Sequence, residues 1–220
     1  MTRLAALYLL ALAACAPREK AAPAAAPAPV IPAQTPSPAG TYRLDRSHAS
    51  LLFKVDHIGF SNYTGQFRRF DATLAFDPKN PAAMAVEASI DVTSLDIPAP
   101  PEGFLGALLG PDWLDAGAHP AMTYRSTRVT LTAPEAARVE GDLTFHGVTA
   151  PVVMDVTFNG GYESFPPYDP NAHIGFSARG VLNRSVFGVT AAIPTQAQPF
   201  GVGDAVAFEI EAEFSEQPAP

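Results

Sequence analysis

The few side chains that could do chemistry together are Asp45, Ser47 and His48, an acid, a hydroxyl and an imidazole within four positions. The same groups form the triads of hydrolases, in which histidine takes the proton of serine and the acid orients the histidine. Groups so close along one strand or turn rarely reach that geometry without a distant partner. The sequence has no Gly-x-Ser-x-Gly elbow, no His-Glu-x-x-His pair and no glycine-rich phosphate loop. We therefore predict that the chain is not an enzyme, with a small hydrolase as the weakest alternative.

The only cysteine, Cys15, follows an 11-residue apolar run, residues 4–14, that begins after a positive charge. The run is too short to cross a membrane, which takes about 20 residues, and is typical of a secretory signal peptide. Its end, Leu12-Ala13-Ala14-Cys15, resembles the lipobox of bacterial lipoproteins, in which the cysteine receives a diacylglyceryl group and becomes the new N-terminus. A single cysteine also excludes a disulfide framework and a thiolate metal cluster, and we predict no metal site.

The lipobox predicts a signal peptide over residues 1–15 and a lipidated Cys15 that carries acyl chains such as palmitate. Two or more acyl chains anchor a protein stably to a membrane. We therefore expect a lipoprotein in the periplasm of a Gram-negative bacterium. Because Ala16 rather than an aspartate follows the cysteine, the outer membrane is the better prediction. A soluble secreted protein is the alternative.

Residues 16–40 contain seven prolines and nine alanines and follow neither the helical nor the strand period. This composition predicts a disordered, semi-rigid tether. The whole chain has a net charge of −8. The segment before residue 41 carries three positive charges and one negative, so the rest of the chain has a net charge of −10. That sign is wrong for holding a phosphate backbone, and we predict no nucleic-acid partner.

From residue 41 onward, apolar and polar side chains alternate with a period of two, which predicts half-buried antiparallel strands. The alternating segments are residues 51–56, 70–77, 84–93, 122–131, 139–145, 152–158, 174–182 and 206–214. About eight such strands predict an all-β domain over residues 41–216, followed by a short tail, 217–220. Alternation alone fits either a closed barrel or a sandwich.

Three local features modify this pattern. Residues 146–149, His-Gly-Val-Thr, predict a hairpin turn, and Pro151 is expected at a strand start, where its missing N–H is tolerated. Between Met122 and Leu131 the apolar residues change from even to odd positions, which predicts a bulge or a strong bend.

Residues 98–117 break the strand period. Phe104, Leu105, Leu108, Leu109 and Trp113 fall on one helical face, while glycines and a proline limit the helix to a turn or two. The segment is predicted to plug one end of a barrel, to form a lid over an apolar cavity, or to do both.

In order and spacing, a series of motifs between residues 42 and 214 resembles the YceI family of exported bacterial proteins. The motifs are Tyr42-Arg-Leu-Asp45, His48-Ala49, Phe53-Lys-Val-Asp-His57-Ile-Gly-Phe60-Ser61, Gly65-Gln-Phe67, residues 76–83, Asp112-Trp-Leu-Asp115, His119-Pro120, Gly141-Asp-Leu-Thr-Phe-His-Gly-Val-Thr149, Pro151-Val152, Leu182-Asn183-Arg184 and Phe187-Gly188. The resemblance implies an extended, eight-stranded, antiparallel lipocalin-like β-barrel with one short helix. It further implies that the lumen holds a polyisoprenoid such as a quinone tail.

This resemblance implies a periplasmic carrier or storage protein for an isoprenoid or similar long-chain lipid, with no other cofactor. The charge favours a neutral head group, such as that of a quinone or a prenol. Where relatives carry a charged helix with a His-Leu pair, this chain has Ala107-Leu108 in the apolar segment 103–111. An adaptor that docks on a membrane redox complex, with a b-type cytochrome as partner, stays as the alternative, and a dimer is left open.

The candidate ligand contacts are the inward-facing apolar residues together with two aromatic residues near an opening and one histidine. They are Leu51, Phe53, Val55, His57, Leu74, Phe76, Val86, Ile90, Phe104, Trp113, Ile174, Phe176, Phe208 and Ile210. His57 follows the apolar face to a strand end and is the candidate head-group contact, whereas His48 falls on the opposite face unless the strand is bulged. For Arg184 we expect an ion pair with a nearby carboxylate in a turn.

Overall fold

The computed structural model describes residues 37–216. The predicted signal peptide, Cys15, most of the predicted tether and the tail 217–220 lie outside the described residues. The last residues of the predicted tether, 37–40, are part of the folded unit, since Ser37 is buried and β1 begins at Gly40. Among residues 37–216, no helix has the length and apolar character to span a membrane.

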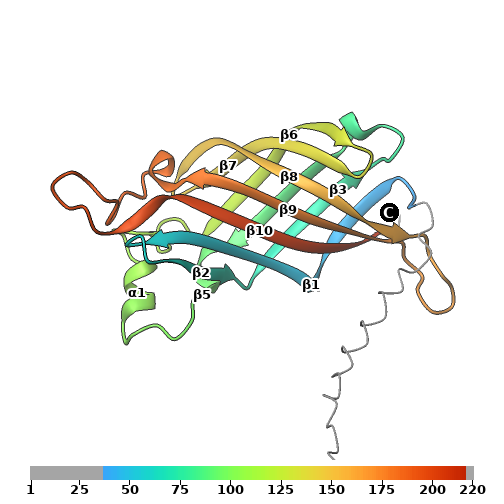
Figure 1. The fold of residues 1–220 in the computed structure, drawn as a ribbon. Helices are drawn as coiled ribbons and strands as arrows, with labels where there is room; N and C mark the ends of the chain where they lie inside the picture. Colours follow the sequence, from blue (N-terminus) through green and yellow to red (C-terminus); the bar gives the residue numbers. More distant parts are fainter. Residues whose placement is uncertain (1–36, 217–220) are drawn as a thin grey trace, which may run out of the picture. The chain divides into compact units, whose positions relative to one another are not determined.

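Eight antiparallel strands close into a barrel (Figure 1). They are β1 (Gly40–His57), β3 (Phe70–Phe76), β4 (Ala85–Asp91), β6 (Ala121–Ala133), β7 (Ala136–Phe145), β8 (Val148–Tyr162), β9 (His173–Asn183) and β10 (Val202–Glu216). Each strand pairs with the next in this order, and β10 pairs with β1 to complete the ring. The predicted lipocalin-like barrel is therefore confirmed, and the sandwich that alternation also allowed is excluded.

The barrel is extended at one end because β1 is long enough to change partners. Residues 40–43 of β1 pair with β3, and residues 52–57 pair with β2 (Ser61–Phe67). The short β5 (Leu95–Asp96) pairs with the other edge of β2. The helix α1 (Phe104–Leu108) lies at this same end (Figure 1). We call it the α1 end. The 3-10 helices are η1 (Pro81–Ala83), η2 (Val92–Ser94) and η3 (Arg184–Phe187).

A large bulge divides β1. Leu44 pairs with Phe214 of β10, and Ala49 pairs with Ala212, so β1 has three more residues than β10 over this stretch. Consequently Leu44 and Leu51, which stand at even and odd positions, both face the interior. The strand is bulged, but His48 lies outside the barrel, with 61% of its side chain exposed.

The smaller local predictions are mostly confirmed. His146 and Gly147 join β7 to β8 with φ of 51° and 74°, the left-handed pair that a two-residue hairpin turn requires. The register between β6 and β7 shifts between Ser126 and Arg128, within the predicted bulge. Pro151 is the fourth residue of β8 rather than the first. It is tolerated there because pairing of β8 with β9 begins only at Asp155.

Candidate functional site

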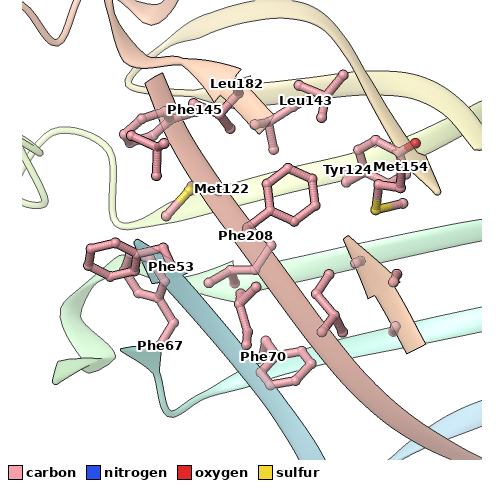
Figure 2. Close-up of a pocket in the computed structure, with 18 of the residues that line it drawn as sticks. Phe53, Phe67, Phe70, Met122, Tyr124, Leu143, Phe145, Met154, Leu182 and Phe208 are labelled. Carbon is pink, nitrogen blue, oxygen red and sulfur yellow. The ribbon is translucent and has the colours of Figure 1, made fainter. Parts of the chain in front are cut away.

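A cavity of about 540 Å³ runs through the interior of the barrel and is lined by residues from all ten strands. This volume is in the range of binding sites for small molecules. Of the lining residues, only His57, Tyr63, Tyr124, Trp113 and Arg184 carry a polar side-chain group. Figure 2 shows the aromatic, methionine and leucine side chains that form much of the wall. Such a lining can exclude water from an apolar molecule but offers few hydrogen bonds to a polar one.

The structure brings twelve of the fourteen predicted contact residues to this cavity. They are Leu51, Phe53, Val55, His57, Leu74, Val86, Ile90, Phe104, Trp113, Phe176, Phe208 and Ile210. Phe76 and Ile174 face inward but do not line the cavity, because they belong to a packed cluster beyond it.

This cluster closes the end of the barrel opposite α1, which we call the packed end. The Phe76 ring lies 5.8 Å from Tyr42 and 5.8 Å from Phe158, measured between ring centroids, and Phe158 lies 5.3 Å from Phe176. Tyr42 is fully buried, and its hydroxyl donates a hydrogen bond of 2.8 Å to the carbonyl of Pro38. Each aromatic pair contributes roughly 0.5–1.5 kcal/mol beyond the area it buries. The cavity therefore ends against a wall of interlocked rings.

At the α1 end, the apolar segment after β5 covers the cavity. Phe104, Leu108 and Trp113 line it, and Leu109 and Leu114 pack against the neighbouring core. Phe104 keeps 39% of its surface exposed, so it stands at the boundary between cavity and solvent. The segment therefore lies where either predicted role, an end plug or a lid, would place it. No residue of α1 is buried, so the segment covers the cavity and also keeps part of its apolar surface toward solvent.

Arg184 corrects the sequence-based expectation of an ion pair. Its guanidinium is buried and donates hydrogen bonds to three backbone carbonyls, those of Gly203 at 2.9 Å, Val189 at 3.0 Å and Val202 at 2.8 Å. It also lies 5.5 Å from the centre of the Trp113 ring, a cation–π geometry. Burial lowers the pKa of Arg184 from its ordinary value, an effect that Asp204 partly offsets. The side chain fixes the start of β10 and the position of Trp113.

The predicted head-group contact, His57, is exposed at the end of β1 and lines the rim of the cavity. Its ring centroid lies 6.1 Å from that of Tyr63 on β2. Sequence reasoning missed Tyr63 and, deeper in the lumen, Tyr124. Tyr124 was recognisable, because it shares the apolar parity of Met122 in the predicted strand.

Asp45, Ser47 and His48 do meet, but outside the barrel and without triad geometry. Asp45 accepts from the Ser47 hydroxyl at 2.6 Å and bonds His48 Nδ1 at 2.8 Å, while the Ser47 hydroxyl lies 3.2 Å from the same Nδ1. A triad needs serine on one ring nitrogen and the acid on the other. The hydrogen bonds from Ser47, then that from His48, lower the pKa of Asp45 to about 2. The cluster stabilises the β1 bulge.

Three glycines explain how large rings fit inside the lumen. A Cβ added at Gly65 would lie 2.4 Å from the Phe53 ring, one at Gly180 would lie 2.5 Å from Phe208, and one at Gly141 would lie 2.5 Å from Tyr124. Gly65 is the direct cross-strand partner of Phe53, and Gly180 that of Phe208. Each ring therefore rests on bare backbone and leaves the centre of the barrel open.

The fold and the site together define a class of protein: a lipocalin-like β-barrel with an internal apolar cavity. Residues 42–214 match the model of the YceI-like domain, and the chain belongs to this family. It is 34% identical over 159 residues to a UPF0312 protein of Pseudomonas savastanoi pv. phaseolicola, and the aligned region covers 71% of this chain and 80% of that protein. It is also 34% identical over 145 residues to a UPF0312 protein of Vibrio cholerae, and this aligned region covers 65% of this chain and 73% of the Vibrio protein.

Solved structures share the fold. The YceI protein of Campylobacter jejuni matches with a TM-score of 0.61 and 25% identity over 74% of this chain and 91% of that one. BcnA of Burkholderia cenocepacia matches with a TM-score of 0.64 and 22% identity, covering 77% of this chain and 98% of its own. A domain of Saccharophagus degradans, described as a polyisoprenoid binding domain, matches with a TM-score of 0.57 and 12% identity over 80% of this chain and 98% of that one.

Proposed function

We propose that this protein binds one long apolar chain of the isoprenoid type in its barrel and acts as a periplasmic carrier or store for that lipid. The observation that carries the proposal is the cavity of about 540 Å³ with an almost wholly apolar wall. The description of the Saccharophagus degradans domain as polyisoprenoid binding supports the same ligand class. Binding needs no catalytic group, and the Asp45 cluster lies outside the cavity.

The energetics favour a carrier for a lipid over a binder of a soluble metabolite. Each buried methylene contributes about 0.8 kcal/mol relative to water, so a prenyl chain gains strongly on leaving water. Relative to a bilayer this gain nearly vanishes, because lipid tails are as apolar as the cavity wall. Such a site can take a chain from a membrane and release it to another, since neither step is strongly uphill.

The direct test is to purify the full chain from its host membranes and to identify copurifying lipids by mass spectrometry. Ala178→Phe on β9 places a ring in the cavity, and Val181→Phe places the same ring on the exposed face of the same strand. We expect the first variant to lose the lipid and the second to keep it. Ala88→Phe, on β4 across the barrel, repeats the test from another wall. Empty wild-type protein that takes up neither labelled prenols nor labelled quinones would overturn the proposal.

The proposed location rests on the sequence of the leader. We propose that Cys15 is lipidated and holds the barrel at the periplasmic side of a membrane, with the outer membrane favoured. Cys15→Ala should release the protein from the membrane fraction, and Ala16→Ser should leave it bound. Equal membrane retention of both variants would contradict the anchor without touching the ligand proposal.

A further inference from the structure

Two loops at the α1 end carry aromatic rings that the barrel does not use. Phe60, in the turn between β1 and β2, is 84% exposed, and Phe200, in the loop before β10, is 67% exposed. Neither ring lines the cavity. One exposed apolar side chain on a protein surface needs no explanation, but two phenylalanines on adjacent loops form the kind of surface that marks an interaction site.

The two loops are joined to each other by a backbone hydrogen bond. The amide of Ile58, two residues before Phe60, donates to the carbonyl of Gly201, the residue after Phe200, at 2.9 Å. Figure 1 shows the loop before β10 projecting beyond the barrel at the α1 end. Phe60 and Phe200 are therefore presented on the same end of the molecule, from loops that touch.

The bases of the same loops form the rim of the cavity. His57, the residue before the β1–β2 turn, pairs with Val202 at the start of β10, and both residues line the cavity. Ala192, in the loop before β10, lines the cavity too, and its carbonyl accepts a hydrogen bond of 2.8 Å from the amide of Val202. A surface that contacts Phe60 and Phe200 would therefore lie against the mouth of the cavity.

Hydrogen bonds hold both loops in shape. The three bonds that Arg184 donates to carbonyls fix the base of the loop before β10. Asp204 adds two bonds there, accepting from the amide and from the hydroxyl of Ser185, each at 2.8 Å. In the β1–β2 turn, Asp56 accepts from the amide of Gly59 at 3.0 Å. Because the loops are formed in advance, contact with a surface costs little conformational entropy.

The two loops are also free of charged residues other than those at their bases. Residues 57–67 and 185–203 contain no Asp, Glu, Lys or Arg, although the chain from residue 41 onward has a net charge of −10. The packed end differs in this respect, because its exposed rings, Phe165 and Tyr168, lie in a loop that also carries Glu163 and Asp169. Only the α1 end therefore combines exposed rings with uncharged loops.

This combination fits a lipid surface. Rings that project singly from loop tips enter the fluid boundary between head groups and acyl chains without a matching pocket, whereas a protein partner would need a pocket for each ring. The neighbouring segment 98–117 carries exposed acids, Glu102 and Asp112, and no Lys or Arg. Those acids repel an anionic surface, so the fitting membrane is one of zwitterionic lipids.

We propose that the α1 end docks on a bilayer of zwitterionic lipids, with the rings of Phe60 and Phe200 inserted at the head groups and the mouth of the cavity turned to the membrane. The inference goes beyond the proposed function, because docking on lipid can be measured without a ligand in the barrel. It identifies the surface through which an apolar chain passes between bilayer and cavity without crossing water.

The first test asks which end of the barrel meets lipid. Phe60→Trp is compared with Phe165→Trp, a change at a similarly exposed ring of the packed end, in the full chain with vesicles of phosphatidylcholine brominated near the head group. Trp113, the single tryptophan of the sequence, is common to both variants and is subtracted with the wild type. We expect quenching and a blue shift of the emission for Phe60→Trp only, and weaker quenching when an anionic phospholipid is added.

Three results would overturn the proposal. Quenching of Phe165→Trp without quenching of Phe60→Trp would show that the packed end meets the membrane. Absence of quenching in both variants would show that the rings at the α1 end do not enter lipid. Sedimentation that shows a dimer, dissolved by Phe60→Ser, would assign this surface to a second copy of the chain.

A kinetic test connects docking to the exchange of lipid. Phe60→Ser and Phe200→Ser together should slow the uptake of a labelled prenylated quinone from phosphatidylcholine vesicles about 5- to 20-fold, because two rings no longer insert. The affinity for the same quinone added from solution should stay unchanged, since neither ring lines the cavity. The matched control, Phe165→Ser with Tyr168→Ser, should alter neither quantity. Both pairs change exposed side chains, so the unfolding midpoint should stay the same.

The outcomes separate docking from ligand binding. An unchanged rate of uptake in the Phe60→Ser, Phe200→Ser variant would overturn the docking proposal and leave the carrier intact. Failure of the wild-type protein to bind the quinone from solution would instead count against the proposed function, and the quenching of Phe60→Trp would still decide whether the α1 end docks on lipid.

Discussion

The two ends of the barrel use the same kinds of residue for opposite results. At the packed end, Phe76 meets Tyr42 and Phe158 ring against ring and does not line the cavity. Toward the α1 end, Phe53 is set into the same β1 wall but lies on Gly65 of β2, and the lumen beside it stays open. Phe76 also pairs with a glycine, Gly40 of β1, so the residue across the strand pair does not decide between core and cavity. The difference lies in the rings around each phenylalanine: those of Tyr42, Phe158 and Phe176 surround Phe76, whereas Phe53 lies against the ring of Phe67.

The largest expected effect comes from removing the packing at the closed end. Phe76→Ala should destabilise the protein by about 3–5 kcal/mol, because it leaves a void among interlocked rings. Phe53→Ala should cost less, roughly 1–3 kcal/mol, since the ring is only half-buried and already borders a cavity. Urea unfolding of the two variants measures the contrast. Equal losses would show that the two ends do not differ in packing.

A second prediction sharpens the comparison by adding one carbon atom. Gly65→Ala should push the Phe53 ring into the lumen, destabilise the fold by about 1–3 kcal/mol and reduce lipid uptake. Gly175→Ala on β9 is the matched control, because nothing lies closer than 3.9 Å to its added Cβ. Retention of bound lipid measured by mass spectrometry, together with the unfolding midpoint, checks both variants. Normal uptake by Gly65→Ala would mean that the glycine does not set the width of the cavity.

The sequence predicted the strands well because a half-buried strand has a strict period of two. It also located the β6 bulge, where the apolar parity changes between Tyr124 and Val129. It did not separate Phe76 from Phe53, because both are phenylalanines on an inward face and the deciding neighbours lie on other strands. The predicted ion pair of Arg184 was wrong for a similar reason. The partners of this side chain are backbone carbonyls of β10 and of the preceding loop, and the sequence pattern gives no sign of them.

The smallest expected effect concerns the β1 bulge around Asp45, which separates the part of β1 at the packed end from the part at the α1 end. Because hydrogen bonds lower the pKa of the Asp45 carboxyl from 3.8 to about 2, the folded state favours its ionised form. The resulting stability is present above pH 4 and is lost as the pH falls toward 2. The group is largely solvated, so Asp45→Asn should cost at most about 1 kcal/mol at neutral pH.

The same substitution tests whether this bulge matters to the cavity. His48 has the opposite pH dependence, because its pKa is raised, mainly by the hydrogen bond to Asp45. Its contribution to the free energy of unfolding is present below the ordinary pKa of 6.5 and is lost as the pH rises above it. Unfolding curves at several pH values should therefore show a difference between wild type and Asp45→Asn that is greatest at mildly acidic pH and vanishes near pH 2. Since Leu44 and Leu51 both reach the lumen only because three residues are looped out between them, loss of the bulge geometry would reverse the inward face of half of β1. We expect lipid binding to survive Asp45→Asn, because the strand pairing on both sides of the bulge holds the register. A stability difference between the two proteins that persists unchanged at pH 2 would show that the carboxylate does not hold the bulge.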